Sequence, residues 1–278
     1  MTRAAGLATL RCPVCSSADP LVWTGTNGTC ACGRTMRILN GCVQYSLSET
    51  LDQIPEVGTR DRHADGYLRH AKFPTQISRV EHFLQSLSGR NSEDVACDLG
   101  CGPGPYTSML AGQGYRVIAV DFSIRSLALN RSSLRATERA AVTYVRADLN
   151  ELRMAPESVD LLLMCDFLQH LGGQSARTAF LTKAFGWLRS GGRFYLTFFN
   201  VNIKNYLKND LRGSFANGSI AYERLRHRDV VSSLPAGVAV DTITPLNIFS
   251  GAMADRLASA IPGASVLSRM IALSGSKA

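Results

Sequence analysis

Short apolar segments alternate with segments of helical periodicity from Asp94 to about residue 200. The apolar segments are the length of strands and lie at Asp94–Leu99, Tyr115–Val120, Val142–Ala147, Val159–Cys165 and Arg193–Phe199. Helical segments lie between them, at Tyr106–Gln113, from Ser123 into the early 130s and at Ser175–Leu188. Continuous apolar strands are typical of a sheet covered on both faces. The pattern predicts an open parallel α/β sheet with ligands at the carboxyl ends of its strands.

The segment before this core has a different pattern. Residues 46–62 are polar and contain a Pro and a Gly, which favours a linker. Residues 63–88 have apolar positions at helical spacing, and Pro74 is expected to divide them into two helices.

Composition excludes several classes of protein. The chain has 278 residues, of which 45% are hydrophobic and 19% charged, as in an ordinary globular protein. It has no apolar run of the roughly 18 residues that a membrane span needs. No sustained apolar stretch precedes the first cysteine, so we expect no secretion signal and a cytoplasmic location. The net charge of +8 favours anionic partners, such as nucleic acid, an acidic metabolite or a membrane surface.

Four cysteines near the N-terminus have the spacing of a metal site. Cys12 and Cys15 form one pair, and Cys30 and Cys32 follow after 14 intervening residues. Four thiolates supply the tetrahedral shell that zinc prefers, with no open position for catalysis, so a bound Zn²⁺ would be structural. Only one residue separates Cys30 from Cys32, and Cys42 is an alternative metal ligand to one of these two. A cluster of free thiols without metal is the other interpretation.

A glycine-rich loop, Gly100-Cys-Gly102-Pro-Gly104, follows the first predicted strand of the core. Glycines permit positive φ and let a ligand approach the backbone, and the helix that begins there can face an anionic group. Asp98 precedes the loop, where its carboxylate can accept a hydrogen bond from an ammonium group. Asp121 lies 21 residues after Gly100 at a strand end, suited to a ribose diol, and Asp148 ends the next strand.

Five ordered segments resemble the successive motifs of class I S-adenosylmethionine-dependent methyltransferases. They are VACDLGCGPGPYT (95–107), AVDFS (119–123), RADLNEL (146–152), SVDLLLMCDFLQHL (158–171) and LRSGGRFYLTFFN (188–200). The resemblance implies a Rossmann-like seven-stranded sheet whose last strand is antiparallel. We place its final strands at Val238–Pro245 and Val266–Ser276. The expected division is a zinc-ribbon-like head at 1–45, a linker and helices at 46–92, and the methyltransferase domain at 93–278.

The same resemblance assigns cofactor-binding roles to particular residues. Asp98 and the glycines at 100, 102 and 104 would face the methionine moiety, and Asp121 would hold the ribose hydroxyls. Phe122, Asp148 and Leu149 would contact the adenine, and Asp166 would lie beside the cofactor.

Two subfamilies of methyltransferase, which differ in the acceptor, are candidates. The N-terminal cysteine ribbon, the helical linker and the GCGxGxYT motif together resemble the large-subunit rRNA guanine methyltransferases, whose ribbon contacts RNA. The net charge of +8 agrees with this resemblance. The segment around His170 resembles the ubiquinone-biosynthesis methyltransferases instead. We favour the latter, with a small-molecule acceptor that reacts through oxygen, and keep an RNA base methyltransferase as the alternative. His170 is the candidate base; a packing role is the other interpretation.

The segment 200–230 leaves the alternating pattern and is rich in basic and aromatic residues. An insertion after the fifth strand of such a sheet lies beside the ligand crevice, so we expect an acceptor lid here. A solvated basic surface is the other interpretation. An excess of basic residues suits an acceptor with negative charge, and the candidate acceptor-binding residues are Lys204, Tyr206, Tyr222, Arg224 and Arg226.

Overall fold

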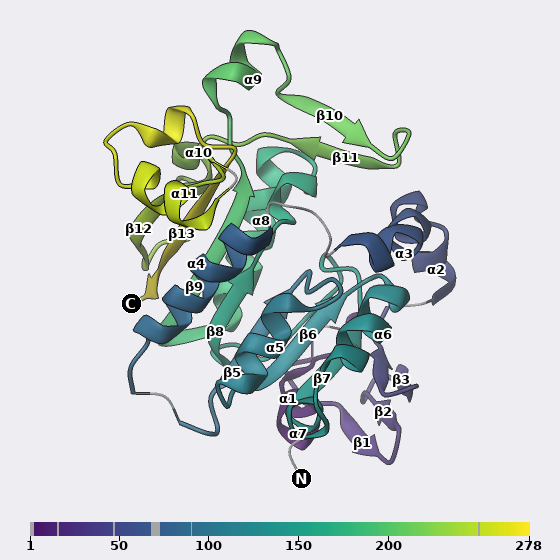
Figure 1. Cartoon of the computed structure of the whole chain (residues 1–278). Helices are drawn as coiled ribbons and strands as arrows, with labels where there is room; N and C mark the ends of the chain where they lie inside the picture. The colour runs from purple at the N-terminus through teal and green to yellow at the C-terminus, as the bar shows by residue number, and fades with distance from the viewer. Residues whose placement is uncertain (1–2, 16, 47, 68–72, 90, 250) are drawn as a thin grey trace. The chain divides into compact units, whose positions relative to one another are not determined.

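The structure, a computed structural model, describes residues 3–15, 17–46, 48–67, 73–89, 91–249 and 251–278 (Figure 1). The chain forms two compact units. The first comprises residues 1–67, 89–162 and 187–189, and the second comprises residues 68–88, 163–186 and 190–278. None of the eight cysteines, all of which lie among the described residues, forms a disulfide.

The first unit contains the parallel strands that the sequence predicted. β5 (Val95–Leu99), β6 (Arg116–Asp121) and β7 (Val142–Arg146) pair in parallel, in the order β7-β6-β5, and β8 (Val159–Met164) follows β5. Nearly every residue of these strands is buried, as expected for strands covered on both faces. Three helices connect them: α5 (Pro105–Gly112), α6 (Ile124–Ser133) and α7 (Ala136–Ala140).

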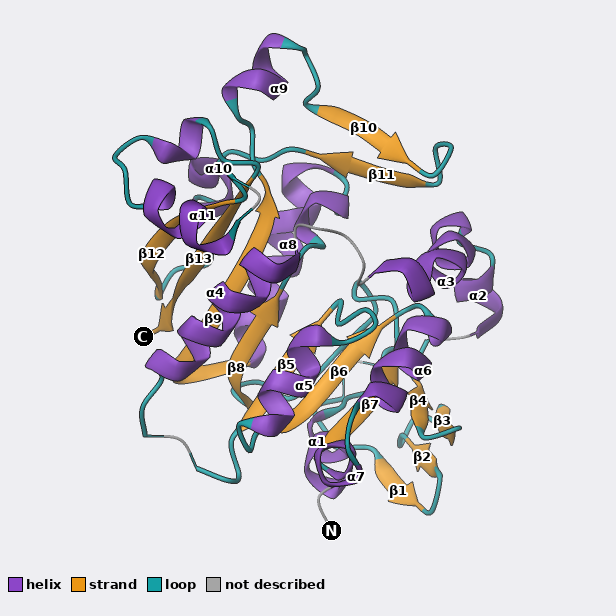
Figure 2. Cartoon of the chain, in the orientation of Figure 1, coloured by secondary structure: helices purple, strands orange, loops and turns teal. Residues whose placement is uncertain are grey.

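A small β region precedes these strands in the chain and extends their sheet. After α1 (Arg3–Thr9) come β1 (Val22–Thr24), β2 (Asn27–Thr29), β3 (Thr35–Leu39) and β4 (Cys42–Gln44). Successive strands pair antiparallel, and β4 then pairs in parallel with β7 (Figure 2). The Tyr45 hydroxyl donates to the carbonyl of Arg11 at 2.7 Å and accepts from the Arg153 N–H at 2.9 Å. The cysteine-bearing region is thereby anchored to the strands of the core.

The segment 46–62 is largely helical, where the sequence pattern favoured a linker. It contains α2 (Ser48–Asp52) and most of α3 (Pro55–Tyr67). Proline at the first position of a helix is favourable because its fixed φ suits the first turn. The i,i+4 ion pair of Arg60 with Glu56 supports α3. Its few buried side chains include Val57 and Ala64, too sparse a set to give an amphipathic pattern.

In the second unit, three strands neighbour one another in the order β9-β13-β12. β9 (Leu188–Phe199) pairs antiparallel with β13 (Met270–Lys277), which pairs antiparallel with β12 (Val238–Leu246). The prediction of an antiparallel last strand is confirmed. β13 begins four residues later than predicted, because a 3-10 turn at Ala264–Val266 precedes it. The unit also contains α4 (Phe73–Ser86), α8 (Gly173–Trp187) and α11 (Ala252–Ser259).

The insertion after β9 forms a β-hairpin flanked by short helices. Its elements are α9 (Ile203–Leu207), β10 (Arg212–Phe215), β11 (Ile220–Glu223) and α10 (His227–Val231). β10 and β11 pair only with each other (Figure 1). Among the described residues, no helix combines the length and the apolar character needed to cross a bilayer.

Strands β5 to β9, β12 and β13 are the seven strands of the predicted Rossmann-like sheet. The fold class is therefore confirmed, with the four cysteines on a small N-terminal β region. The domain boundaries at 45 and 92 remain predictions.

Candidate functional site

The glycine loop adopts a conformation that side chains disfavour. Gly100, Gly102 and Gly104 have φ values of +71°, +53° and +100°. A Cβ on Gly104 would lie 2.3 Å from Cγ of Asn130, so a side chain at this position would clash with that amide. The N–H groups of Gly100 and Cys101 both donate to the carbonyl of Val120, at 2.9 and 3.0 Å. The loop is thus fixed to the carboxyl end of β6.

Asp121, the last residue of β6, lies directly against this loop. Its Oδ2 accepts from the N–H of Gly102 at 2.9 Å, and its Oδ1 accepts from the N–H of Ser123 at 2.8 Å. Burial raises the pKa of Asp121, and these two hydrogen bonds oppose the shift. Each carboxylate oxygen keeps a second lone pair, so the group can also accept from two hydroxyls.

Asp98 is the next-to-last residue of β5, and its side chain is buried. Its Oδ2 accepts from the hydroxyl of Thr107 at 2.7 Å. Burial raises its pKa from 3.8 to about 7 against the effect of the Thr107 hydrogen bond, and the nearby charge of Asp121 raises it further. A bound cation would favour the ionised carboxylate.

Asn130 on α6 joins the parts of this loop region, a role that the sequence did not reveal. Its Nδ2 donates to the hydroxyl of Thr107 at 2.9 Å and to the carbonyl of Gly102 at 3.4 Å. Its Oδ1 accepts from the Tyr144 hydroxyl at 3.2 Å. The side chain is fully buried, so these partners meet the polar requirement of its amide.

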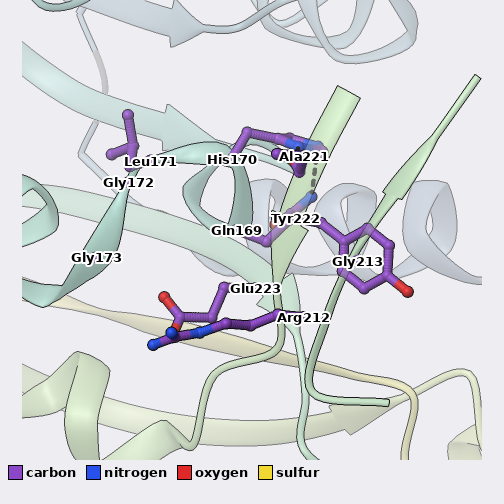
Figure 3. A pocket seen from close by; sticks show the side chains of 10 residues that line it. All are labelled: Gln169, His170, Leu171, Gly172, Gly173, Arg212, Gly213, Ala221, Tyr222 and Glu223. Carbon is purple, nitrogen blue, oxygen red and sulfur yellow. Dashed lines mark hydrogen bonds and ion pairs between the residues drawn. The ribbon is translucent and has the colours of Figure 1, made fainter. Parts of the chain in front are cut away.

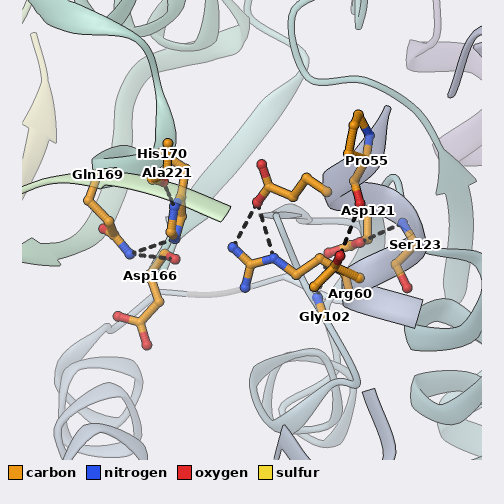
Figure 4. A network of polar contacts seen from close by, with 11 residues as sticks. Pro55, Arg60, Gly102, Asp121, Ser123, Asp166, Gln169, His170 and Ala221 are labelled. Atoms are coloured by element: carbon orange, nitrogen blue, oxygen red, sulfur yellow. Dashed lines mark hydrogen bonds and ion pairs between the residues drawn. The ribbon is translucent and has the colours of Figure 1, made fainter. Parts of the chain in front are cut away.

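Helix α3 brings charged residues to the same end of β6 (Figure 4). Asp61 accepts from the hydroxyl of Ser123 at 2.5 Å and from the N–H of Arg125 at 3.1 Å. The positive charge of Arg60 lowers the pKa of Asp121. Arg60 and Asp61 were not predicted as site residues, because they lie in the polar segment 46–62 that was expected to be a linker.

The predicted adenine contacts belong to the same unit. Phe122 is half-buried, and its carbonyl accepts from Arg146 Nε at 3.2 Å. Asp148 donates its N–H to the Ser46 hydroxyl at 3.0 Å and accepts from the N–H of Asn150 at 2.8 Å. Leu149 is half-buried beside it in the chain.

Asp166 and His170 belong to the second unit (Figure 4). The carboxylate of Asp166 accepts from Gln76 Nε2 at 3.0 and 3.1 Å and from the Thr197 hydroxyl at 2.9 Å. Nδ1 of His170 lies 2.6 Å from the carbonyl oxygen of Ala221. A carbonyl can only accept, so Nδ1 carries the proton and Nε2 of the neutral ring keeps its lone pair. Nε2 lies 3.4 Å from the amide nitrogen of Gln169.

The predicted acceptor-binding residues occupy two kinds of position. Arg224 and Tyr222 take part in contacts within the insertion: both bond to the carboxylate of Asp210, at 2.9 and 2.8 Å. The Arg224 guanidinium also lies over the rings of Tyr222 and Phe199, at 5.2 and 5.8 Å from their centroids. The side chains of Lys204, Tyr206 and Arg226 are exposed.

The four cysteines of the N-terminal region converge. Their sulfur atoms all lie within 4.8 Å of one another, with Cys12 Sγ 3.7 Å from Cys32 Sγ and Cys15 Sγ 3.3 Å from Cys30 Sγ. A tetrahedral zinc with Zn–S bonds of about 2.3 Å separates its sulfurs by roughly 3.8 Å, so this set fits the ion. Cys42 is outside the group and directs its thiol to the carbonyl of Val43.

Comparisons with known proteins find similarity to methyltransferases. Residues 97–196 match the family described as "Methyltransferase domain". A ubiquinone biosynthesis O-methyltransferase of Idiomarina loihiensis is 28% identical over 50% of this chain and 54% of its own length. A trans-aconitate 2-methyltransferase of Paracidovorax citrulli is 32% identical over 44% of this chain and 45% of its own. The chain thus spans about half the length of these two curated relatives.

A solved structure supports the fold. Geranyl diphosphate C-methyltransferase of Streptomyces coelicolor A3(2) superposes with a TM-score of 0.55 at 14% identity, over 72% of this chain and 80% of the other. Residues 97–196 therefore match a methyltransferase domain, and the fold is shared with a solved methyltransferase structure. In sequence the chain is distantly similar to the ubiquinone-biosynthesis O-methyltransferases.

The residues present fit S-adenosylmethionine. The positive-φ loop leaves its backbone open beside Gly102, where an added Cβ would meet no atom closer than 4.0 Å. Asp121 has lone pairs that can accept from the two hydroxyls of a ribose. The ammonium group of the methionine moiety would favour the ionised form of the buried Asp98 carboxyl.

Proposed function

We propose that the protein is an S-adenosylmethionine-dependent methyltransferase (EC 2.1.1.-) that acts on a small-molecule acceptor, through an oxygen nucleophile. The observation that carries this proposal is the hydrogen bond from the Gly102 N–H to Asp121, which holds the glycine loop and the ribose-binding carboxylate in one arrangement. The domain match over residues 97–196 supports it.

When bound, S-adenosylmethionine supplies a methyl group activated on a sulfonium. The task of the protein is to bind and orient, because the leaving group is already activated. Asp98 and the loop of Gly100, Gly102 and Gly104 hold the methionine moiety, and Asp121 holds the ribose. Phe122, Asp148 and Leu149 are the proposed adenine contacts, and Asp166 is a further proposed cofactor-binding residue.

His170 is the proposed general base for a hydroxyl acceptor. Its Nδ1–H is held by the carbonyl of Ala221, which fixes the tautomer and presents Nε2 as a proton acceptor. A positioned imidazole of this kind typically contributes about 10²- to 10⁴-fold to a rate. The tether also links this base to strand β11 of the insertion.

The insertion 200–230 is the proposed acceptor lid, and the acceptor is an anionic metabolite. Exposed Lys204 and Arg226 supply positive charge, and Tyr206 supplies an exposed ring. The name of one relative, a ubiquinone biosynthesis O-methyltransferase, supports transfer to oxygen. The name of another, a trans-aconitate 2-methyltransferase, supports a small acceptor.

We also propose one structural zinc ion per chain, held by Cys12, Cys15, Cys30 and Cys32. The four sulfur atoms lie within 4.8 Å of one another, and the N–H of Val14 donates to the sulfur of Cys12 at 3.4 Å. Such amide donors stabilise thiolates, the form in which cysteine binds zinc.

A transfer assay with tritiated S-adenosylmethionine tests the class of acceptor. The protein is incubated with total RNA or with a metabolite extract, each with and without ribonuclease. Label in small molecules that survives ribonuclease supports the proposal. Label confined to ribonuclease-sensitive material would make the protein an RNA methyltransferase instead.

A further inference from the structure

A pocket of about 330 Å³ lies between the residues that follow β8 and the hairpin β10–β11 (Figure 3). All of its lining residues belong to the second unit. One wall comes from η1 (Leu168–His170) and the start of α8, and the opposite wall from both strands of the hairpin. Of the residues predicted from the sequence, His170 and Tyr222 line it.

Gln169 presents an unsatisfied hydrogen-bond acceptor in this pocket. Its Nε2 donates to the carbonyl of Asp166 at 2.8 Å, whereas its Oε1 has no hydrogen-bond partner among the described residues. The side chain is 1% exposed, so water satisfies this oxygen poorly. An acceptor left unpaired in a buried position is destabilising, and a ligand hydroxyl would satisfy it. Nε2 of the neighbouring His170 lies 3.4 Å from the amide nitrogen of Gln169.

The other side of the pocket attracts negative charge. The carboxylate of Glu223 accepts from Arg177 Nη1 at 2.6 Å and from Arg212 Nη2 at 2.7 Å. Although burial raises the pKa of Glu223, hydrogen bonds from these two arginines bring it below its ordinary value. With Glu223 ionised, the three groups carry a net charge of +1. The side chain of Arg212 is 78% exposed and lines the pocket.

The N-terminus of a long helix reinforces this charge. Gly172 and Gly173 line the pocket, and the 15-residue helix α8 begins at Gly173. The first N–H groups of a helix carry partial positive charge and are a favourable environment for a carboxylate.

Tyr222 provides the apolar surface of the pocket. Its hydroxyl is bonded to Asp210, and its ring stacks on Phe215 with centroids 4.5 Å apart. Gly213 lies opposite it in the hairpin register, and a Cβ there would lie 2.7 Å from the phenol oxygen. The close approach of the two strands fixes the ring in place.

We infer that this pocket binds a hydroxylated carboxylate, with its hydroxyl donating to Oε1 of Gln169 beside His170 and its carboxylate at Arg212 and the N-terminus of α8. The inference rests on the proposed methyltransferase function, because its ligand is the proposed methyl acceptor. The carbon skeleton lies against the ring of Tyr222. Arg212 and Gln169 are thus acceptor-binding residues.

Calorimetry with three simple probes tests the inference in protein saturated with S-adenosylhomocysteine. 4-Hydroxybenzoate has both groups, benzoate lacks the hydroxyl and phenol lacks the carboxylate, whereas their rings fill the same space. We expect 4-hydroxybenzoate to bind most tightly. Arg212→Ala should weaken its binding about tenfold, because a charged hydrogen bond is lost. Gln169→Leu should remove the preference for 4-hydroxybenzoate over benzoate.

Arg135→Ala is the matched control, because Arg135 is also 78% exposed and paired with a glutamate, but lies in the first unit. Its affinity for 4-hydroxybenzoate should be unchanged. Equal affinity for the three probes, or equal losses in Arg212→Ala and Arg135→Ala, overturns the inference. Binding of S-adenosylhomocysteine without binding of any of the three probes overturns it as well. Failure to bind S-adenosylhomocysteine would instead count against the proposed function itself.

Discussion

The backbone N–H of Gly102 donates to Oδ2 of Asp121 across 2.9 Å, and this bond joins the glycine loop to the end of the neighbouring strand. The loop and the carboxylate come from sequence segments 19 residues apart. Because Gly102 has a φ of +53°, its N–H can point at the carboxylate without strain from a side chain. The bond orients Asp121 while leaving lone pairs on the same carboxylate for a ligand.

The affinity for the cofactor product should rise with pH. Burial raises the pKa of Asp98 to about 7, so this carboxyl is mostly protonated at pH 6 and ionised at pH 8. Only the ionised form attracts the ammonium group of S-adenosylhomocysteine. We expect binding to be about tenfold weaker at pH 6 than at pH 8 in calorimetry. In Asp98→Asn this part of the pH dependence should disappear; if the variant keeps the full dependence, another group is responsible.

The same carboxyl should lower the stability of the ligand-free protein as pH rises. A folded-state pKa above the ordinary value of 3.8 means that the folded chain binds this proton more tightly than the unfolded chain. The contribution of Asp98 to the free energy of unfolding therefore falls between about pH 4 and pH 7. Urea unfolding at pH 5 and pH 8 measures it: the wild type should lose more stability than Asp98→Asn over this interval. Equal losses would contradict the assignment.

The cysteine cluster should hold about one zinc per chain. Cys32→Ser should lose most of the metal and unfold at a lower temperature, because the ion joins two segments of the N-terminal region. Cys42→Ser is the matched control, since Cys42 is buried in the same region but lies outside the cluster. Elemental analysis of protein purified without added zinc provides the measurement. Metal retained by Cys32→Ser and lost from Cys42→Ser would show that the ligand set is wrong.

His170→Gln should lower kcat about 100-fold or more once an acceptor is known, with little change in the affinity for S-adenosylhomocysteine. The reason is the loss of the Nε2 lone pair that would take the acceptor proton. The pH profile of kcat should also lose its acidic limb. His227→Gln, a half-buried histidine of the same insertion, serves as the control. A variant with normal kcat and an unaltered profile would assign His170 a packing role.

Alanine variants of Lys204, Arg224 and Arg226 should raise KM for the acceptor several-fold and leave cofactor affinity unchanged. Arg224→Ala should also make the insertion more sensitive to proteases, because it removes the ion pair with Asp210 and the contact with Tyr222. Steady-state kinetics and limited proteolysis measure the two effects. If cofactor affinity falls instead, the 200–230 segment is not an acceptor lid.

The parts of the fold that follow local rules could be predicted from the sequence. Buried strands such as β5 and β6 are continuous apolar runs, and the loop at Gly100–Gly104 is marked by its glycines. The four cysteines were recognisable because zinc ligands come in closely spaced pairs. Helix α3 was missed because its stability comes from packing and an ion pair rather than from an amphipathic pattern.

Contacts between distant segments could not be predicted in the same way. Asn130 is an ordinary helical residue in the sequence, and its bonds to Thr107 and Gly102 depend on how α6 packs. Arg212 and Gln169 line the same pocket, in which the hairpin register places Arg212 opposite Glu223. No local pattern in the sequence encodes that pairing.

Calorimetric titration with S-adenosylhomocysteine tests the central claim, that the loop and Asp121 form the cofactor site. The wild type should bind, and Asp121→Ala should weaken binding by tenfold or more, because hydrogen bonds from the ribose to a charged acceptor are lost. Asp98→Ala should weaken it to a similar degree. Asp160→Ala, an acidic residue on β8 outside the site, should bind as the wild type does. Unchanged affinity in both site variants, with the fold intact by circular dichroism, would contradict the account.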